Sequence, residues 1–104
     1  MQRKYLVEIT KVAERDATSI FAYIVRDNPD AAVKWIEEIE RQIDSLETFP
    51  ERSPIIPESK ELGRQYHHLI FGNYRTIFRI QGSKVIIMRV VHGARLLNLE
   101  IFEK

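Results

Sequence analysis

Two strand-like runs separated by one short turn constrain the fold most strongly. Residues 74–80 and 84–92 are rich in β-branched and aromatic side chains, and the Gln-Gly-Ser sequence at 81–83 is short enough for a hairpin. Three arginines interrupt the two runs: Arg75, Arg79 and Arg89. Because a buried cation almost always has a partner, we expect these arginines to meet an anion. The anion can belong to a ligand or to the same chain.

The sequence ahead of this hairpin predicts a strand and two helices. Residues 5–10 alternate with the two-residue period of a strand. Apolar residues then recur every three or four positions over residues 10–27 and 29–46, as in amphipathic helices. Asn28-Pro29 separates the two stripes, since asparagine caps helices and proline is favoured at the first helical position. Two such helices form a hairpin whose apolar stripe needs a sheet to cover it. We expect Trp35, on that stripe, to lie in the core.

A proline-rich segment connects the helices to the later strands. PERSPIIPESKE, residues 50–61, contains three prolines and predicts an irregular connection, with Ile55 and Ile56 tucked under the sheet edge. A further strand is expected over residues 66–71, ahead of the Gly-Asn turn at 72–73. The order β-α-α-β-β-β predicts the α+β class, with an antiparallel sheet packed against an N-terminal helical hairpin. At 104 residues the whole chain, 1–104, is expected to form a single domain.

Composition excludes several classes of function. The sequence contains no cysteine, so thiolate and disulfide chemistry are impossible. No apolar run approaches the roughly 20 residues of a membrane span, and the N-terminus lacks the apolar core of a signal peptide. We therefore expect a cytoplasmic protein without a membrane partner. Neighbouring strand histidines, His67 and His68, point to opposite faces and cannot chelate one ion, so neither a metal site nor a cofactor is expected.

Charge is divided unevenly along the chain. Residues 1–59 contain 8 Lys and Arg against 12 Asp and Glu, whereas residues 60–104 contain 8 against 3. The basic half coincides with the predicted hairpin strands rather than with a solvated helix face. Such a distribution favours a protein that presents its C-terminal half to an anionic partner; the alternative is the ordinary scatter of charge on a small domain.

Strand alternation predicts which of these cations share a face. Arg75 and Arg79 are two positions from Ile77 on either side, so both point to one side of their strand, roughly 13 Å apart. In the following strand, Arg89 is expected on the same face as Val85, Ile87 and Val91, opposite Ile86, Met88, Val90 and His92. The alternative for Arg75 and Arg79 is a pair of internal salt bridges to helix carboxylates such as Asp16 or Glu40.

The segments LGRQYHHLIFGNYRTIFRI and VIIMRVVHGARLL, together with the order of the predicted elements, closely resemble the RelE/ParE superfamily of toxins from type II toxin–antitoxin systems. The specific part is the Tyr74-Arg75 dipeptide and the ending from Arg89 to Arg95. This resemblance implies the RelE/ParE toxin fold and a cognate antitoxin that neutralises the protein in a hetero-oligomer. It also implies toxicity by one of two routes, through the ribosome and its mRNA or through DNA gyrase.

The ribosome-dependent nucleases of the superfamily suggest one set of site residues. There, arginines at the positions of Arg75 and Arg95 bind the scissile phosphate, and guanidinium groups suit a transition state that gains negative charge. His92 can act as the acid or base, because imidazole titrates near about 6.5; its alternative is a strand-end residue bonded to backbone. The nucleases often have a tyrosine near the C-terminus, where this chain has Ile101 and Phe102.

The ParE side of the superfamily offers a second interpretation, which we favour. The HGAR ending and the LGR sequence resemble ParE proteins, which poison gyrase by protein contact and need no acid–base residues. The chain then cuts no bond, and its contacts to target or antitoxin would come from a set of five basic residues: Arg64, His67, Arg75, Arg79 and Arg95. A third alternative is a nontoxic module that only binds an antitoxin peptide.

Overall fold

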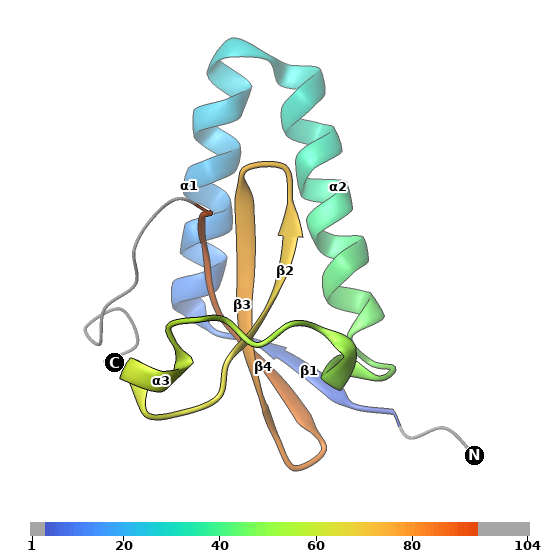
Figure 1. Ribbon diagram of the computed structural model, residues 1–104. Helices are drawn as coiled ribbons and strands as arrows, with labels where there is room; N and C mark the ends of the chain where they lie inside the picture. Colours follow the sequence, from blue (N-terminus) through green and yellow to red (C-terminus); the bar gives the residue numbers. More distant parts are fainter. Residues whose placement is uncertain (1–3, 94–104) are drawn as a thin grey trace.

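The computed structural model describes residues 4–93 and contains two long helices over a four-stranded sheet (Figure 1). The elements, in chain order, are β1 (Leu6–Ile9), α1 (Lys11–Asp27), α2 (Pro29–Ser45), the 3-10 helix η1 (Pro50–Arg52), α3 (Ser59–Leu62), β2 (His67–Phe71), β3 (Tyr74–Gln81) and β4 (Lys84–His92). The predicted strands and long helices are all present, with ends within about two residues of those expected. The α+β class is confirmed.

The strand order is β1-β4-β3-β2, and the sheet is mixed. β2 pairs with β3, and β3 with β4, in the antiparallel direction, as the two short turns predicted. β1 instead joins β4 in parallel, with Leu6 opposite Lys84 and Ile9 opposite Ile87. In the sequence, the helical hairpin lies between β1 and the other strands, so no short turn sets the direction of β1.

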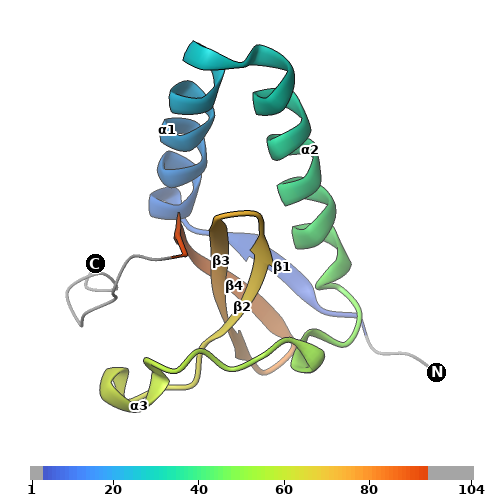
Figure 2. The same ribbon diagram turned by 45° about the horizontal axis from the view of Figure 1, so that its top comes forward.

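The two long helices begin with the caps that the sequence predicted. The hydroxyl of Thr10 accepts a hydrogen bond from Ala13 N at 3.1 Å, and Asn28 Oδ1 accepts one from Ala31 N at 3.1 Å. Pro29 occupies the first turn of α2, where its missing N–H costs nothing. The helices meet at this break and spread apart where they approach the sheet (Figure 2).

One face of the sheet packs against the helices. Phe78, Val85 and Ile87 are fully buried beneath Ala13 and Leu46. A neighbouring cluster surrounds Trp35, which is 5% exposed and contacts Ile39 and Val90. The core position predicted for Trp35 is therefore confirmed. Burying an aromatic or branched side chain in this way contributes roughly 1.5–3 kcal/mol per residue.

The proline-rich connection covers part of the opposite face. Ile56 is 1% exposed and packs against Tyr66, Ile77 and Val91, whereas its neighbour Ile55 is 49% exposed. The expectation that both isoleucines lie under the sheet edge is thus correct for Ile56 and wrong for Ile55, because extended backbone points adjacent side chains in opposite directions. The connection is also less irregular than expected, since it contains η1 and α3.

A β-bulge in β4 changes which residues share a face. Ile77 pairs with Arg89 but the next residue, Phe78, pairs with Ile87, which leaves Met88 as the extra residue. Val90 consequently faces the helices beside Trp35, and Val91 lies on the opposite face beside Ile56. The predicted face assignment in β4 is therefore wrong beyond Met88, because a bulge inserts one residue into the alternation.

No helix within residues 4–93 is long and apolar enough to cross a membrane.

Candidate functional site

Two of the predicted site residues, Arg75 and His92, line one hollow beside the β2–β3 turn and the end of β4. The hollow has a volume of about 340 Å³ and is called the Arg75 hollow below. Cross-strand pairing of Ile70 with Arg75 and of His68 with Ile77 brings these side chains to the sheet face away from the helices. The lining residues are Pro57, His68, Ile70, Gly72, Asn73, Tyr74, Arg75, His92 and Gly93.

Arg75 is buried and paired with an acid of its own chain. Its side chain is 7% exposed, and Nη2 and Nη1 donate to the two carboxylate oxygens of Glu58 at 2.7 and 3.3 Å. These hydrogen bonds lower the pKa of Glu58 below its ordinary value, against the opposing effect of burial. The alternative of an internal salt bridge is therefore confirmed for Arg75. Its partner lies in the connection instead of at the expected Asp16 or Glu40.

His68 contributes an imidazole to the same hollow. Burial lowers the pKa of His68 below its ordinary value, and the positive charge of Arg75 lowers it further. Its Nδ1 is buried and has no hydrogen-bond partner within residues 4–93. Both effects favour the neutral form of this side chain, which can serve as a hydrogen-bonding group in the hollow.

His92 is exposed at the rim of the hollow, and its ring contacts Tyr74, which in turn contacts the buried Trp35. Its ring meets Tyr74 edge to face at 5.5 Å between centroids, and Tyr74 meets Trp35 in the same manner at 5.5 Å. Gly93 N donates to Asn73 O at 2.6 Å, which fixes the end of β4 against the β2–β3 turn. The imidazole is thus accessible to a partner while its position is set by the fold.

The other predicted residues lie away from this hollow. His67 is 7% exposed, with Nδ1 2.7 Å from the carbonyl oxygen of Ser53 and its ring stacked on Phe78. Arg64 is exposed in a separate shallow depression beside α3. Arg79 is half-buried farther along β3, on the Arg75 face as strand alternation predicted. Arg95 lies outside the described residues.

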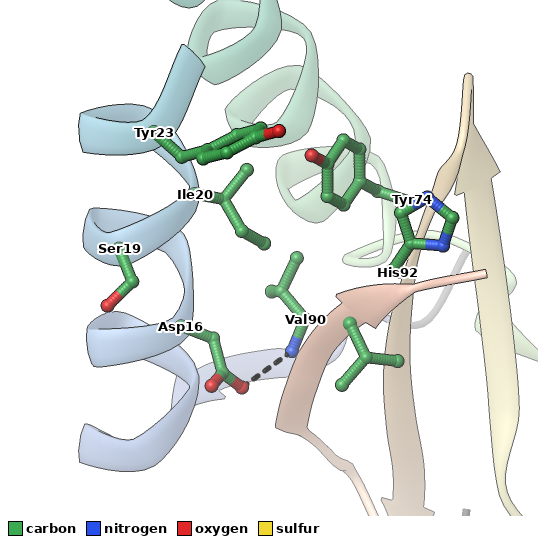
Figure 3. Close-up of a pocket in the computed structure, with 8 residues that line it drawn as sticks. Asp16, Ser19, Ile20, Tyr23, Tyr74, Val90 and His92 are labelled. Atoms are coloured by element: carbon green, nitrogen blue, oxygen red, sulfur yellow. Dashed lines mark hydrogen bonds between the residues drawn. The ribbon is translucent and has the colours of Figure 1, made fainter. Parts of the chain in front are cut away.

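A second hollow, of about 300 Å³, lies between α1 and the end of β4 (Figure 3). Tyr23 and Ile20 extend from α1 toward Tyr74 and His92 on the sheet side. Tyr74 and His92 line both hollows, so the two sites share one wall. Sequence reasoning missed this site, because Tyr23 lies on the polar side of its helix and no motif marks it.

Asp16, at the edge of the second hollow, forms a second ion pair of low exposure. Its carboxylate accepts from Arg89 at 2.6 and 2.9 Å and from the backbone N–H of Val90 at 3.0 Å. β1 has ended at Ile9, so Asp16 takes the place of a neighbouring strand along this edge of β4. The expected helix acid therefore pairs with Arg89 and not with Arg75 or Arg79.

The Arg75 hollow is better suited to binding a partner than to cleaving a bond. The guanidinium is paired with Glu58, the lowered pKa of His68 favours its neutral form, and apart from His92 and Asn73 the remaining lining residues are apolar, aromatic or glycine. General acid–base catalysis needs a proton donor and acceptor within about 2.6–3.2 Å of the reacting atoms. Within residues 4–93, no three His, Cys, Asp or Glu side chains are grouped so that they could hold a metal ion.

Comparison with known proteins gives a family match over most of the chain. Residues 7–97 match the family described as the ParE toxin of the type II toxin–antitoxin system parDE. The fold resembles the chromosomal ParDE system of P. aeruginosa, with 19% identity, a TM-score of 0.68, and coverage of 86% of this chain and 96% of the other. It also resembles the Mycobacterium tuberculosis RelBE2 toxin–antitoxin complex, with 24% identity, a TM-score of 0.57, and coverage of 91% and 98%. No curated protein gave a significant sequence match.

Proposed function

This chain belongs to the ParE toxin family of type II toxin–antitoxin systems, and we propose that it arrests growth by binding DNA gyrase. The observation that carries the choice of gyrase is the pairing of Arg75 with Glu58. A nuclease of the related kind needs that guanidinium for the scissile phosphate, whereas inhibition through protein contact does not. The lowered pKa of His68 supports the same choice, because a neutral imidazole beside Arg75 adds no charge to attract RNA.

The partner in the resting state is a cognate antitoxin, with which the chain forms a hetero-oligomer. Solved structures of similar fold come from toxin–antitoxin systems, which supports this assignment. An apolar groove of about 380 Å³ between α1 and α2 is a candidate binding site for an antitoxin segment. Ile36, Ile39 and Ile43 line it from α2, and Ile9 at its end is 45% exposed. A disordered segment that folds on binding would cover this apolar surface.

A ribosome-dependent mRNA endonuclease is the second candidate. Its support is that Arg75, His68 and His92 line one hollow. This function requires Arg75 to exchange Glu58 for a phosphate in the ribosome-bound state. A nontoxic module that retains only antitoxin binding is the third candidate, and it predicts neither nucleic-acid damage nor growth arrest.

Induced expression of the chain without its antitoxin separates these candidates. We expect growth arrest with double-strand DNA breaks and intact mRNA, measured by pulsed-field electrophoresis and by primer extension on abundant transcripts. Co-expression of the antitoxin encoded beside the toxin is the control and should restore growth. Codon-phased mRNA cleavage without DNA breaks would overturn the gyrase proposal. Normal growth with soluble, folded chain would favour the binding module.

A further inference from the structure

The acid that neutralises Arg75 belongs to the segment covering the outer face of the sheet. Glu58 lies 17 residues before Arg75 in the sequence, between the buried Ile56 and the buried Ser59. The two side chains of the pair are only 7% and 19% exposed, so water screens their attraction weakly. The carboxylate of Glu58 therefore stays paired with Arg75, directly next to Pro57 in the lining of the Arg75 hollow.

Backbone and side-chain contacts on both sides of Glu58 fix its position. Ile56 N donates to Tyr66 O at 2.9 Å, and the hydroxyl of Ser59 accepts from Tyr66 N at 2.9 Å. These bonds attach the connection to the start of β2, and Ile56 anchors it in the outer cluster. A ligand that displaced the Glu58 carboxylate would have to move an anchored segment as well as break the ion pair.

We propose that Glu58 is a specificity-determining residue that excludes phosphate groups from the Arg75 hollow and leaves this surface to a protein partner. The proposal rests on the proposed function, inhibition through protein contact. A phosphate beside Arg75 would meet the negative charge of Glu58 at short range, and repulsion between like charges is an effective means of rejecting a wrong partner. A guanidinium group is itself a bidentate donor of the kind suited to phosphate.

The test measures binding of a fluorescently labelled 12-nucleotide single-stranded RNA to the purified chain by anisotropy, at several salt concentrations. We expect Glu58→Gln to bind this RNA about tenfold more tightly than the wild-type chain, since one charged hydrogen-bonded contact is gained. The dependence of log affinity on log salt should steepen by about 0.7, the value for one added phosphate contact on a single strand. Adding Arg75→Gln to Glu58→Gln should abolish both changes.

Two matched variants separate this effect from net charge and from folding. Glu61→Gln removes an exposed carboxylate three residues farther along the same segment and should leave RNA affinity within about twofold of wild type. Glu58→Asp keeps the charge and should retain wild-type affinity. Equal RNA binding by Glu58→Gln and Glu61→Gln, or a gain in Glu58→Asp as large as in Glu58→Gln, would overturn the proposal.

A measurement on the wild-type chain tests the same idea without depending on how the variants fold. Inorganic phosphate is added to isotopically labelled protein, and the NMR resonances of the Arg75 side chain are followed. We expect no saturable shift, because Glu58 already occupies the guanidinium; a saturable shift would contradict the proposal. Since neither experiment contains gyrase, their failure is distinguishable from failure of the proposed function, which the DNA-break assay reports separately.

Discussion

At the scale of single residues, two arginines of the sheet are stabilised by acids from other elements. Arg75 pairs with Glu58 and Arg89 pairs with Asp16, and all four side chains are less than one-fifth exposed. A charge in such an environment is tolerated because its partner is present, so removing one partner costs more than the pair itself contributes. Each pair therefore yields a prediction about stability that is independent of the biological target.

Removing the guanidinium of Arg75 should destabilise the fold. Arg75→Gln leaves the Glu58 carboxylate half-buried without its cation, and we expect the free energy of unfolding to fall by about 3 kcal/mol. Urea denaturation followed by circular dichroism measures this change. Arg64→Gln, at an exposed position, should change it by no more than about 0.5 kcal/mol. Similar small effects for both variants would show that the Glu58–Arg75 pair has little structural importance.

Stability should fall as the solution is made acidic, in two steps. The pKa of His68 is lower in the folded chain than the unfolded value of about 6.5, so the unfolded state binds protons first and stability decreases below that pH. The pKa of Glu58 is also lowered, so its contribution is present above about pH 4.3 and is lost as pH falls through the folded value. Urea denaturation at a series of pH values should show both declines. His68→Gln should reduce the first decline. If the free energy of unfolding changes with pH between pH 7 and 5 as steeply in His68→Gln as in the wild-type chain, this assignment is refuted.

At the scale of elements, the short β1 leaves the end of β4 to be completed by a helix. Thr10 N donates to Ile87 O at 3.1 Å, and its hydroxyl to Met88 O at 3.2 Å, before Asp16 accepts from Val90 N. The start of α1 thereby continues the edge that β1 began, directly beside the bulge at Met88. This arrangement attaches the helical hairpin to the sheet by hydrogen bonds as well as by apolar contacts.

Substitution of Asp16 tests this attachment. Asp16→Ala leaves both the Arg89 guanidinium and the Val90 N–H without their acceptor, and we expect a loss of about 3 kcal/mol. Asp16→Asn keeps an oxygen for Val90 but loses the charge, so its loss should be smaller. Denaturation of Glu37→Ala, which removes an exposed acid from α2, is the control and should show little change. Equal stability of Asp16→Ala and the control would rule out this role.

At the scale of the whole molecule, acidic residues predominate in residues 1–59 and basic residues in residues 60–104, called the basic half here. Arg64 lies exposed on the basic half, and Arg15 is exposed on α1. If the basic half meets gyrase, Arg64→Glu should weaken inhibition of gyrase supercoiling about tenfold, equivalent to about 1.4 kcal/mol. Arg15→Glu makes the same charge change on the helical half and should leave inhibition unchanged. Equal effects of the two variants would indicate attraction by net charge alone.

The sequence was informative about elements and less so about their long-range partners. Thr10 and Asn28-Pro29 predicted the helix starts because caps act over three residues, and the residues at 72–73 and 81–83 predicted the hairpins. Glu58 and Asp16 were not identified as the partners of Arg75 and Arg89, since they lie 17 and 73 residues away in the sequence. The bulge at Met88 was missed because neither glycine nor proline marks it. The direction of β1 depends on the crossover of the helical hairpin and has no local signal.

The position of Tyr74 gives this chain an internal reporter. Its ring forms part of the wall of both hollows and lies edge to face with Trp35, the one tryptophan of the sequence. A molecule that shifts Tyr74 on arrival in either hollow will alter the surroundings of the indole and hence its emission. Titrations of unlabelled chain can therefore be followed by intrinsic fluorescence.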